Sequence, residues 1–391
     1  MLKDQFSRFL AQEPGRLHFA AHSHHPWPDV TRTAVLEAWD DAARLIDRKW
    51  ERVFSKVVPA AQGHVARVLD LSRPGQIAFA PSTHELVVRL LSCLLDREGL
   101  RILTTDAEFL SFARQAARLE ELPRVEVTRV AAEPFATFAE RFRRAAAAGD
   151  HDLVYLSQVF YDSGFVVGEL PAIVGSVRRA DAIVVVDGYH AFGAVPTSLR
   201  AIEDRAFYVA GGYKYAMSGE GACFMHVPAR CRLRPVDTGW FATFGRLEEA
   251  KPAAVEYPED GFRFWGATFE PTGLYRFNAV MEWMDGLGLS AEGVHEHARG
   301  LQERFLAGLE QRRVSALPAG ALVTPRPLDR QGNFLVFRLP HAADLGRRLR
   351  EAGVVVDWRG DRLRFGFGVY QDAADVDALL ERLGSLPGPT P

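Results

Sequence analysis

Two polar residues that follow neighbouring apolar runs of the sequence could act together in chemistry. Asp187 ends the run AIVVVD, and Lys214 lies in the turn GGYKY after the run AFYVAG. Asp187 could be an ordinary turn residue before Gly188, and Lys214 could extend its amine to water over apolar surface. The flanking Tyr213 and Tyr215 instead indicate a pocket that keeps water from the amine and lowers its pKa toward the neutral, nucleophilic form.

An acid at one strand end and a lysine after the next strand together match the needs of one cofactor. Pyridoxal phosphate (PLP) needs a lysine that binds it as a Schiff base and later moves protons at the substrate α-carbon. It also needs a carboxylate that keeps its pyridine nitrogen protonated. The sequence therefore predicts that Lys214 holds PLP and is catalytic, and that Asp187 pairs with the ring.

The elements that must position these residues follow a βα rhythm between residues 77 and 227. Near-continuous apolar runs between amphipathic stretches predict a mostly parallel α/β sheet with helices on both faces. The carboxyl ends of such strands carry functional groups, which suits Asp187 and Lys214. The expected strands are 77–80, 101–106, 125–131, 152–157, 182–187, 206–211 and 222–227, and the expected helices are near 83–95, 111–121, 137–148 and 170–179.

The βα rhythm ends near residue 230, where an irregular segment rich in aromatics, Pro and Gly begins. A smaller α/β pattern follows, with helices near 272–286, 291–312, 341–351 and 373–384 and apolar runs at 333–339, 354–358 and 362–367. We predict an N-terminal arm at 1–30, a large PLP-binding domain at 31–270 and a small C-terminal domain at 271–391.

The segments DGYHAFGAVPTSL and AGGYKYAMSGEGACFMHV resemble the class V aminotransferase family, and within it the kynureninase-like branch. The resemblance covers nearly the whole chain and implies fold type I of the PLP-dependent transferases, with a mixed, mostly parallel sheet. It implies that His190 of the Asp-x-x-His element contacts the cofactor and that Tyr213 lies near the phosphate. It also implies a homodimer with sites at the subunit interface.

Other segments add expected cofactor contacts. Ser82 and Thr83 follow an apolar run and precede a helix, where they could hold the phosphate or act as an ordinary N-cap. By resemblance Phe109 stacks on the cofactor ring, although a core Phe is the alternative. Trp240 and Thr268 resemble elements that reach a neighbouring subunit's site, although Trp240 could be a core aromatic.

Three residues are expected on the substrate side. Arg364 of RLRFGF resembles the arginine that holds the α-carboxylate through two parallel hydrogen bonds, and a surface ion pair is its alternative. Tyr161 resembles the family's Tyr-x-Thr-Gly turn, and Ser23 matches an Asn-Ser-Leu-Gly arm near the substrate carboxylate. The arm's histidines at 18, 22, 24 and 25 lack a neighbouring carboxylate or cysteine, so we expect no metal.

The reaction stays open between several kinds of PLP chemistry. Cys231 lies 133 positions before Arg364 (364 minus 231), which argues against a desulfurase that uses a cysteine just before that arginine. The kynureninase Gly-Trp-x-Gly-His element reads GWFAT from Gly239, and the Asn that contacts the kynurenine ring is missing from FWGA at 264–267. We predict a class V aminotransferase-like enzyme acting on a small L-amino acid, with kynureninase-type hydrolysis as the alternative.

Less favoured readings are a cysteine desulfurase or lyase, a non-catalytic PLP-binding regulator and a nucleotide-binding protein. The chain shows no added DNA-binding segment, no GxGxxG after a strand and no GKS or GKT loop. Its formal net charge of -3 argues against nucleic acid as a partner. No apolar stretch is long enough for a membrane span, and charges interrupt the first residues, so we expect a cytoplasmic protein.

Overall fold

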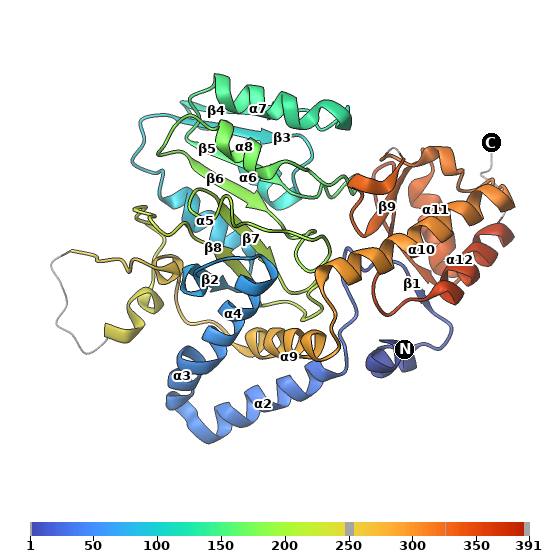
Figure 1. Ribbon diagram of the computed structural model, residues 1–391, viewed down its shortest axis with the longest axis horizontal. Helices are drawn as coiled ribbons and strands as arrows, with labels where there is room; N and C mark the ends of the chain where they lie inside the picture. The colour runs from blue at the N-terminus through green and yellow to red at the C-terminus, as the bar shows by residue number, and fades with distance from the viewer. Residues whose placement is uncertain (1, 247–253, 325, 387–391) are drawn as a thin grey trace.

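A seven-stranded sheet forms the centre of the molecule in the computed structural model, which describes residues 2–246, 254–324 and 326–386 (Figure 1). Residues 1 and 387–391 of the predicted arm and small domain lie outside the described residues. The strand order is β2-β8-β7-β6-β5-β3-β4. The strands are β2 (Ile77–Ala80), β3 (Leu100–Thr105), β4 (Val125–Val130), β5 (Leu153–Ser157), β6 (Ile183–Asp187), β7 (Phe207–Gly211) and β8 (Cys223–His226).

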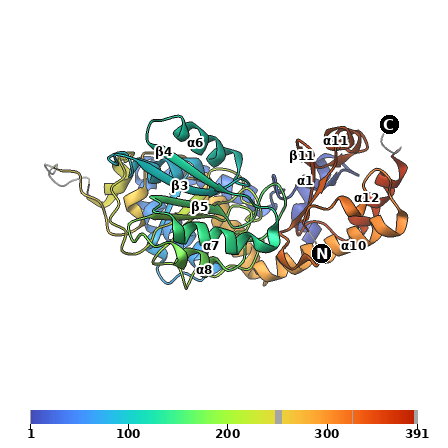
Figure 2. The same ribbon diagram turned by 90° about the horizontal axis from the view of Figure 1, so that it is seen from above.

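The direction of the strands agrees with the predicted class. β4, β3, β5, β6 and β7 are parallel, while β8 runs antiparallel to β7 and to β2. The connecting helices are α5 (Thr83–Ser92), α6 (Leu110–Glu120), α7 (Phe138–Ala148) and α8 (Leu170–Ser176). Figure 2 shows α6 on one face of the sheet and α7 and α8 on the other. The prediction of a mixed, mostly parallel sheet covered on both faces is confirmed.

Helices that no sequence pattern predicted precede the sheet. α1 (Ser7–Gln12) follows a 3-10 helix at Leu2–Phe6, and α2 (Val30–Leu45), α3 (Lys49–Arg52) and α4 (Val58–Val68) lead to β2. α2 packs along α9 (Thr272–Gly286), as Figure 1 shows. The buried residues of α2 include small ones such as Ala34 and Ala38, so α2 lacks the large apolar stripe that would mark a helix in sequence.

The C-terminal part forms a second unit with its own hydrophobic cluster. A three-stranded antiparallel sheet, in the order β11-β12-β9, packs with three helices. The elements are α10 (Ala291–Arg312), β9 (Phe334–Arg338), α11 (Ala342–Glu351), β11 (Asp357–Arg359), β12 (Arg362–Gly366) and α12 (Ala373–Ser385). The expected strand 354–358 is split, because Val354–Val355 (β10) pairs instead with the N-terminal β1 (Leu17–His18). The predicted domain boundaries stay a prediction.

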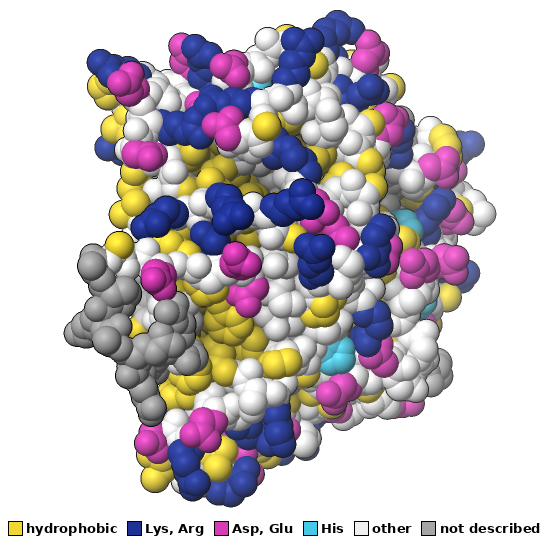
Figure 3. Space-filling model, turned by 60° about the vertical axis from the view of Figure 1, so that its left-hand side comes forward, with side chains coloured by type: hydrophobic (Ala, Val, Ile, Leu, Met, Phe, Trp, Pro, Cys, Tyr) yellow, Lys and Arg dark blue, Asp and Glu magenta, His cyan; other side chains and the backbone are white. Residues whose placement is uncertain are grey.

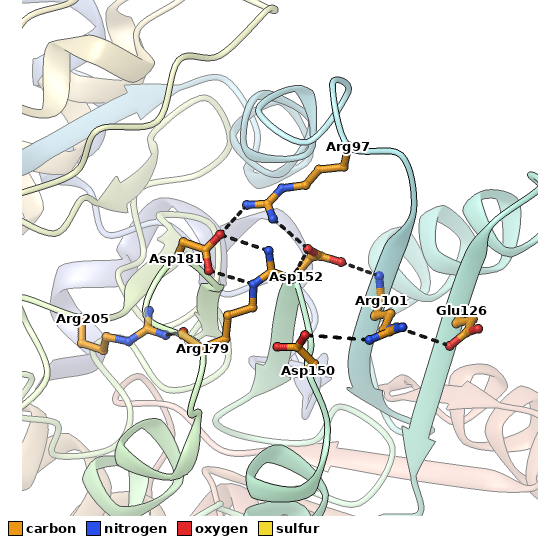
Figure 4. A network of polar contacts seen from close by, with 8 residues as sticks. All are labelled: Arg97, Arg101, Glu126, Asp150, Asp152, Arg179, Asp181 and Arg205. Carbon is orange, nitrogen blue, oxygen red and sulfur yellow. Dashed lines mark hydrogen bonds and ion pairs between the residues drawn. The ribbon is translucent and has the colours of Figure 1, made fainter.

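Charged residues form a network at the amino ends of the parallel strands (Figure 4). The buried Asp152 accepts hydrogen bonds from Arg97 Nη1 at 3.1 Å, Arg179 Nη1 at 2.6 Å and the backbone N–H of Arg101 at 2.8 Å. Asp181 pairs with Arg97 and Arg179 on the solvent side. The network ties β3, β5 and the segment before β6 together at the edge opposite Asp187.

No helix among the described residues is long and apolar enough to cross a membrane.

Candidate active site

A cavity of about 240 Å³ lies at the carboxyl ends of the parallel strands. Asp187 ends β6, and Lys214 follows the adjacent parallel strand β7, so the register of the two strands brings both residues to the same edge. The cavity is lined by most of the residues predicted to bind the cofactor: Ser82, Thr83, Phe109, Asp187, His190, Tyr213 and Lys214. The sheet therefore brings together residues that lie up to 132 positions apart (214 minus 82).

The Lys214 side chain is buried among aromatic rings. Its Nζ lies 5.4 Å from the ring centre of Phe109, 4.8 Å from that of Tyr189 and 5.6 Å from that of Tyr213. His190 Nε2 lies 2.8 Å from Nζ. Desolvation lowers the pKa of Lys214 to about 7, although the nearby carboxylate of Asp187 opposes this shift. A lysine with this pKa has a substantial neutral fraction near pH 7.

Two donors hold the Asp187 carboxyl group at the cavity floor. Oδ1 accepts a hydrogen bond from the backbone N–H of Tyr189 at 2.9 Å, and Oδ2 accepts one from the Tyr155 hydroxyl at 2.8 Å. Desolvation raises the pKa of Asp187, while these donors and the Lys214 charge act to lower it. The Tyr155 ring is itself fixed, because it stacks on Phe112 with 3.6 Å between ring centres.

The rim of the cavity is formed by the first residues of two helices. Ser82 is the N-cap of α5, and its Oγ accepts a hydrogen bond from the Glu85 N–H at 3.3 Å. The N-cap alternative of the sequence analysis is thus present, and the neighbouring Thr83 still faces the cavity. Phe109 precedes α6 and meets the Tyr161 ring edge-on at 5.7 Å.

Trp240 and Thr268 do not line this cavity. They lie together, with the Trp240 Nε1–H donating to Thr268 Oγ1 at 3.0 Å. Thr268 lines a separate cavity of about 280 Å³ that shares only Pro81 with the first cavity. Trp240 is not a core residue, because 37% of its surface is exposed.

The three residues expected on the substrate side do not line the cavity either. Arg364 is buried on β12, and its Nη1–H donates to the Tyr161 carbonyl at 2.8 Å. Its Nη2 forms an ion pair with Asp357 on β11. Tyr161 connects Arg364 to the cavity, since its ring lies 5.8 Å from the Arg364 guanidinium and also contacts Phe109. Ser23 Oγ contacts the His24 ring at 3.4 Å.

The histidines of the arm separate into different surroundings. His18 Nδ1 contacts the Tyr370 hydroxyl at 2.6 Å, His24 stacks on Tyr213, and His25 Nδ1 contacts the Pro26 carbonyl at 2.8 Å. His22 is fully buried and stacks on Phe334. Within the described ranges, no three His, Cys, Asp or Glu side chains are grouped so that they could hold a metal ion.

Sequence reasoning missed several groups of the site. Tyr189 covers Lys214 and Tyr155 holds Asp187. Glu108, buried next to Phe109, accepts hydrogen bonds from Thr105 and Ser157. Burial raises the pKa of Glu108 to about 8, although these donors act to lower it. A signal was present in part, because Tyr155 and Tyr189 lie on or directly after strands that were predicted.

Comparisons with known proteins identify the family of this chain. Residues 47–379 match the family model of class-V aminotransferases. The chain is 29% identical over 375 residues to a kynureninase of Deinococcus radiodurans, which covers 93% of this chain and 83% of that protein. It is 30% identical over 239 residues to a kynureninase of Burkholderia mallei, with 59% and 55% covered.

Solved structures share the fold at low sequence identity. An apo cysteine desulfurase from Thermococcus onnurineus NA1 superposes with a TM-score of 0.78 at 18% identity, covering 96% of this chain and 95% of that one. A C-DES mutant with glycine linked to its PLP cofactor gives 0.81 at 18% identity, covering 98% and 99%. The predicted fold and the predicted cofactor of the family, PLP, are confirmed. The chain belongs to the class-V aminotransferase family.

Proposed function

We propose that this protein is a PLP enzyme that acts on a small L-amino acid, with Lys214 as the cofactor-binding and catalytic lysine. The observation that carries the proposal is the buried Lys214 amine, 2.8 Å from His190 and enclosed by aromatic rings, at the same sheet edge as Asp187. Without a ligand such an environment is costly for a lysine. It suits an amine that must be neutral in order to bind a carbonyl carbon.

The residues around the cavity fit the chemical parts of PLP. Asp187 offers a carboxylate held by two donors at the cavity floor, which suits the pyridine nitrogen. Phe109 offers a ring face, and Ser82, Thr83 and Tyr213 offer polar groups to the phosphate at the start of α5. When bound, PLP supplies an electron sink for an amino acid joined to it.

The protein's own groups would then handle the substrate and its protons. Lys214 moves a proton at the α-carbon, and His190 at 2.8 Å orients the amine. In this proposal Arg364 receives the α-carboxylate, Tyr161 lies between Arg364 and the cavity, and Ser23 contributes to the substrate side from the arm. Glu108 keeps the turn before Phe109 fixed through its bonds to Thr105 and Ser157.

An aminotransferase-like reaction is our first candidate, and kynureninase-type hydrolysis of a Cβ–Cγ bond is the second. The identity to kynureninases over most of the chain favours the second candidate. The residues that would recognise an aryl ketone differ from those of the kynureninases. The kynureninase His falls on Thr243. The segment that lacks the kynureninase Asn contains Trp265, which is fully buried among Phe54, Phe262 and Phe269.

We also propose a cytoplasmic homodimer in which Trp240 and Thr268 approach the partner's cofactor. These two residues pair with each other outside the cavity of their own chain, which is consistent with a role across an interface. The exposed side chains of Leu95, Leu122 and Val236 line an apolar surface cavity of about 600 Å³. Figure 3 shows hydrophobic side chains gathered in hollows of one face. Such surfaces commonly mark protein interfaces.

Borohydride reduction of the PLP-loaded protein tests the proposed cofactor site. We expect a mass increase on the peptide that contains Lys214, and none in Lys214→Ala. Lys49→Ala, which changes a lysine on α3, should label like the wild type. A wild-type protein that takes up no PLP, or that is labelled on another lysine, would contradict the proposal.

A substrate panel tests the reaction. The loaded protein is incubated with amino acids and with kynurenine, and keto acid, alanine, anthranilate and sulfide are measured by mass spectrometry. We expect a keto acid from a small amino acid. Anthranilate from kynurenine would replace the first candidate with the second, and sulfide from cysteine would contradict both.

A further inference from the structure

Arg364, which is expected to hold the substrate carboxylate, is already paired with a carboxylate of this chain. Asp357 on β11 lies directly opposite Arg364 on β12 in the strand register, and its Oδ2 forms an ion pair with Arg364 Nη2. His22 Nε2 lies 3.9 Å from the same oxygen. A cation and an imidazole thus converge on one carboxylate oxygen, which is the arrangement that a bound substrate carboxylate would require.

Buried polar atoms without partners distinguish this pair from an ordinary cross-strand ion pair. Arg364 Nε and both ring nitrogens of His22 are buried without a hydrogen-bond partner among the described residues. Buried polar atoms without partners are costly, so a native site commonly holds them for a ligand. Asp357 therefore leaves the Arg364 Nε–H and the single N–H of a neutral His22 ring unused, and a substrate carboxylate in its place could accept from them.

The Arg364 site is connected to the Lys214 cavity. Arg364 contacts the Tyr161 ring and carbonyl, Tyr161 contacts Phe109, and Phe109 lies against Lys214. The positive charge of Arg364 also acts on Lys214 and lowers its pKa. A carboxylate at Arg364 would thus belong to a molecule that can reach the lysine.

Asp357 has a second cation available on its own strand. Arg359 is two residues further along β11, so its side chain projects from the same face of the strand. Arg359 is exposed, and no carboxylate of the described part of the chain forms an ion pair with it. Asp357 is not sealed in, because 14% of its side chain is exposed.

We propose that Asp357 is a specificity-determining residue, an internal carboxylate that occupies Arg364 in the empty site and moves to Arg359 when the substrate carboxylate binds. The inference rests on the proposed function, because Arg364 is the substrate-carboxylate residue there. Ligands without a carboxylate cannot displace Asp357 from Arg364 and are excluded from the site. Ligands with a carboxylate must first displace Asp357, so they bind more weakly than they would to an unpaired Arg364.

Isothermal titration of the PLP-loaded protein with propionate, a carboxylate without an amine, measures the competition directly. We expect Asp357→Asn to bind propionate on the order of tenfold more tightly than the wild type, because a neutral amide competes poorly for a guanidinium. Arg364→Gln should abolish binding. The matched control is Asp361→Asn, an exposed acid in the turn between β11 and β12, which should bind propionate like the wild type.

Arg359→Gln tests the second position of Asp357 without touching the Arg364 pair. We expect several-fold weaker propionate binding at an unchanged melting temperature and PLP content, because the displaced carboxylate loses its new partner. Propionate affinity in Asp357→Asn that is equal to or below that of the wild type would overturn the proposal. If Asp357→Asn does not fold, wild-type affinity in Arg359→Gln overturns it instead. Labelling of Lys214 tests the proposed function separately.

Discussion

At the scale of single residues, the chemistry depends on how burial and neighbouring groups shift the pKa values of two ionisable groups in opposite directions. Desolvation lowers the pKa of Lys214 and raises that of Asp187, while the mutual attraction of the two groups counters both shifts. Their types and spacing were readable in the sequence. The contact of Tyr155 with Asp187 was not readable, because it joins two separate strands. The contact of Asp357 with Arg364 was not readable either, because it depends on the register in which β11 and β12 pair.

Removing the Tyr155 hydroxyl should move the acid limb of the pH profile. Tyr155→Phe takes a donor from the charged form of Asp187, so the carboxyl pKa rises and the acid limb of kcat/KM moves to higher pH. We expect kcat to fall about tenfold, because losing one hydrogen bond to a charged group costs about 1.5 kcal/mol. Tyr208→Phe is the matched control, since its buried hydroxyl donates to Gln158 instead. An unchanged profile in Tyr155→Phe would remove Tyr155 from the site.

The lowered pKa of Lys214 predicts the pH range in which the apoprotein binds PLP fastest. The neutral amine is the reactive form, so the capture rate should rise with pH through about 7 and level off above it. Stopped-flow absorbance measures this rate. Arg364→Gln removes a charge that lowers this pKa, so its inflection should lie at higher pH. A rate that continues to rise toward the ordinary lysine pKa of 10.5 would contradict the desolvated environment.

At the scale of elements, the buried strands were predictable and the pairing of short segments was not. The run AIVVVD predicted β6 to within one residue, because a strand covered on both faces is continuously apolar. The run VVVDW predicted one strand but forms two, since Val354 pairs with Leu17 of the arm while Asp357 pairs with Arg364. Leu17 and Val354 lie far apart in the sequence, so no local pattern could show that the run divides before Asp357.

The charged network at the amino ends of the strands should contribute to the stability of the fold and not to the chemistry of the candidate site. Asp152→Ala leaves Arg97 and Arg179 without their buried partner, and we expect the free energy of unfolding to fall by about 3 kcal/mol. Asp181→Ala, at a position where 59% of the side chain is exposed, should cost less than about 1 kcal/mol. Denaturant unfolding measures both. Equal losses in the two variants would show that burial of Asp152 is not what matters.

At the scale of the whole molecule, the N-terminal arm joins the two units at the site. Leu17 pairs with Val354 and Ala20 bridges to Gly366 in the C-terminal unit, while the His25 N–H donates to the Tyr213 carbonyl next to Lys214 at 3.1 Å. The arm thus carries His22 to Arg364 and ends at the lysine turn. Figure 1 shows β1 of this segment next to α12, within the C-terminal unit.

The proposed homodimer predicts that damaged subunits repair each other. If Trp240 and Thr268 serve the partner's cofactor, Thr268→Ala damages the partner's site while Lys214→Ala damages its own. A mixed dimer of the two variants then has one site with both residues intact and one with neither.

Random mixing of these two variants after unfolding and refolding should give mixed dimers in about half of the molecules, and so restore about a quarter of the sites. The measurement is enzymatic turnover per subunit on the best substrate of the panel. A mixture of Lys214→Ala with Asp187→Asn is the control and should restore nothing, because both residues belong to the same site. Restoration in neither mixture would mean that Thr268 acts within its own chain.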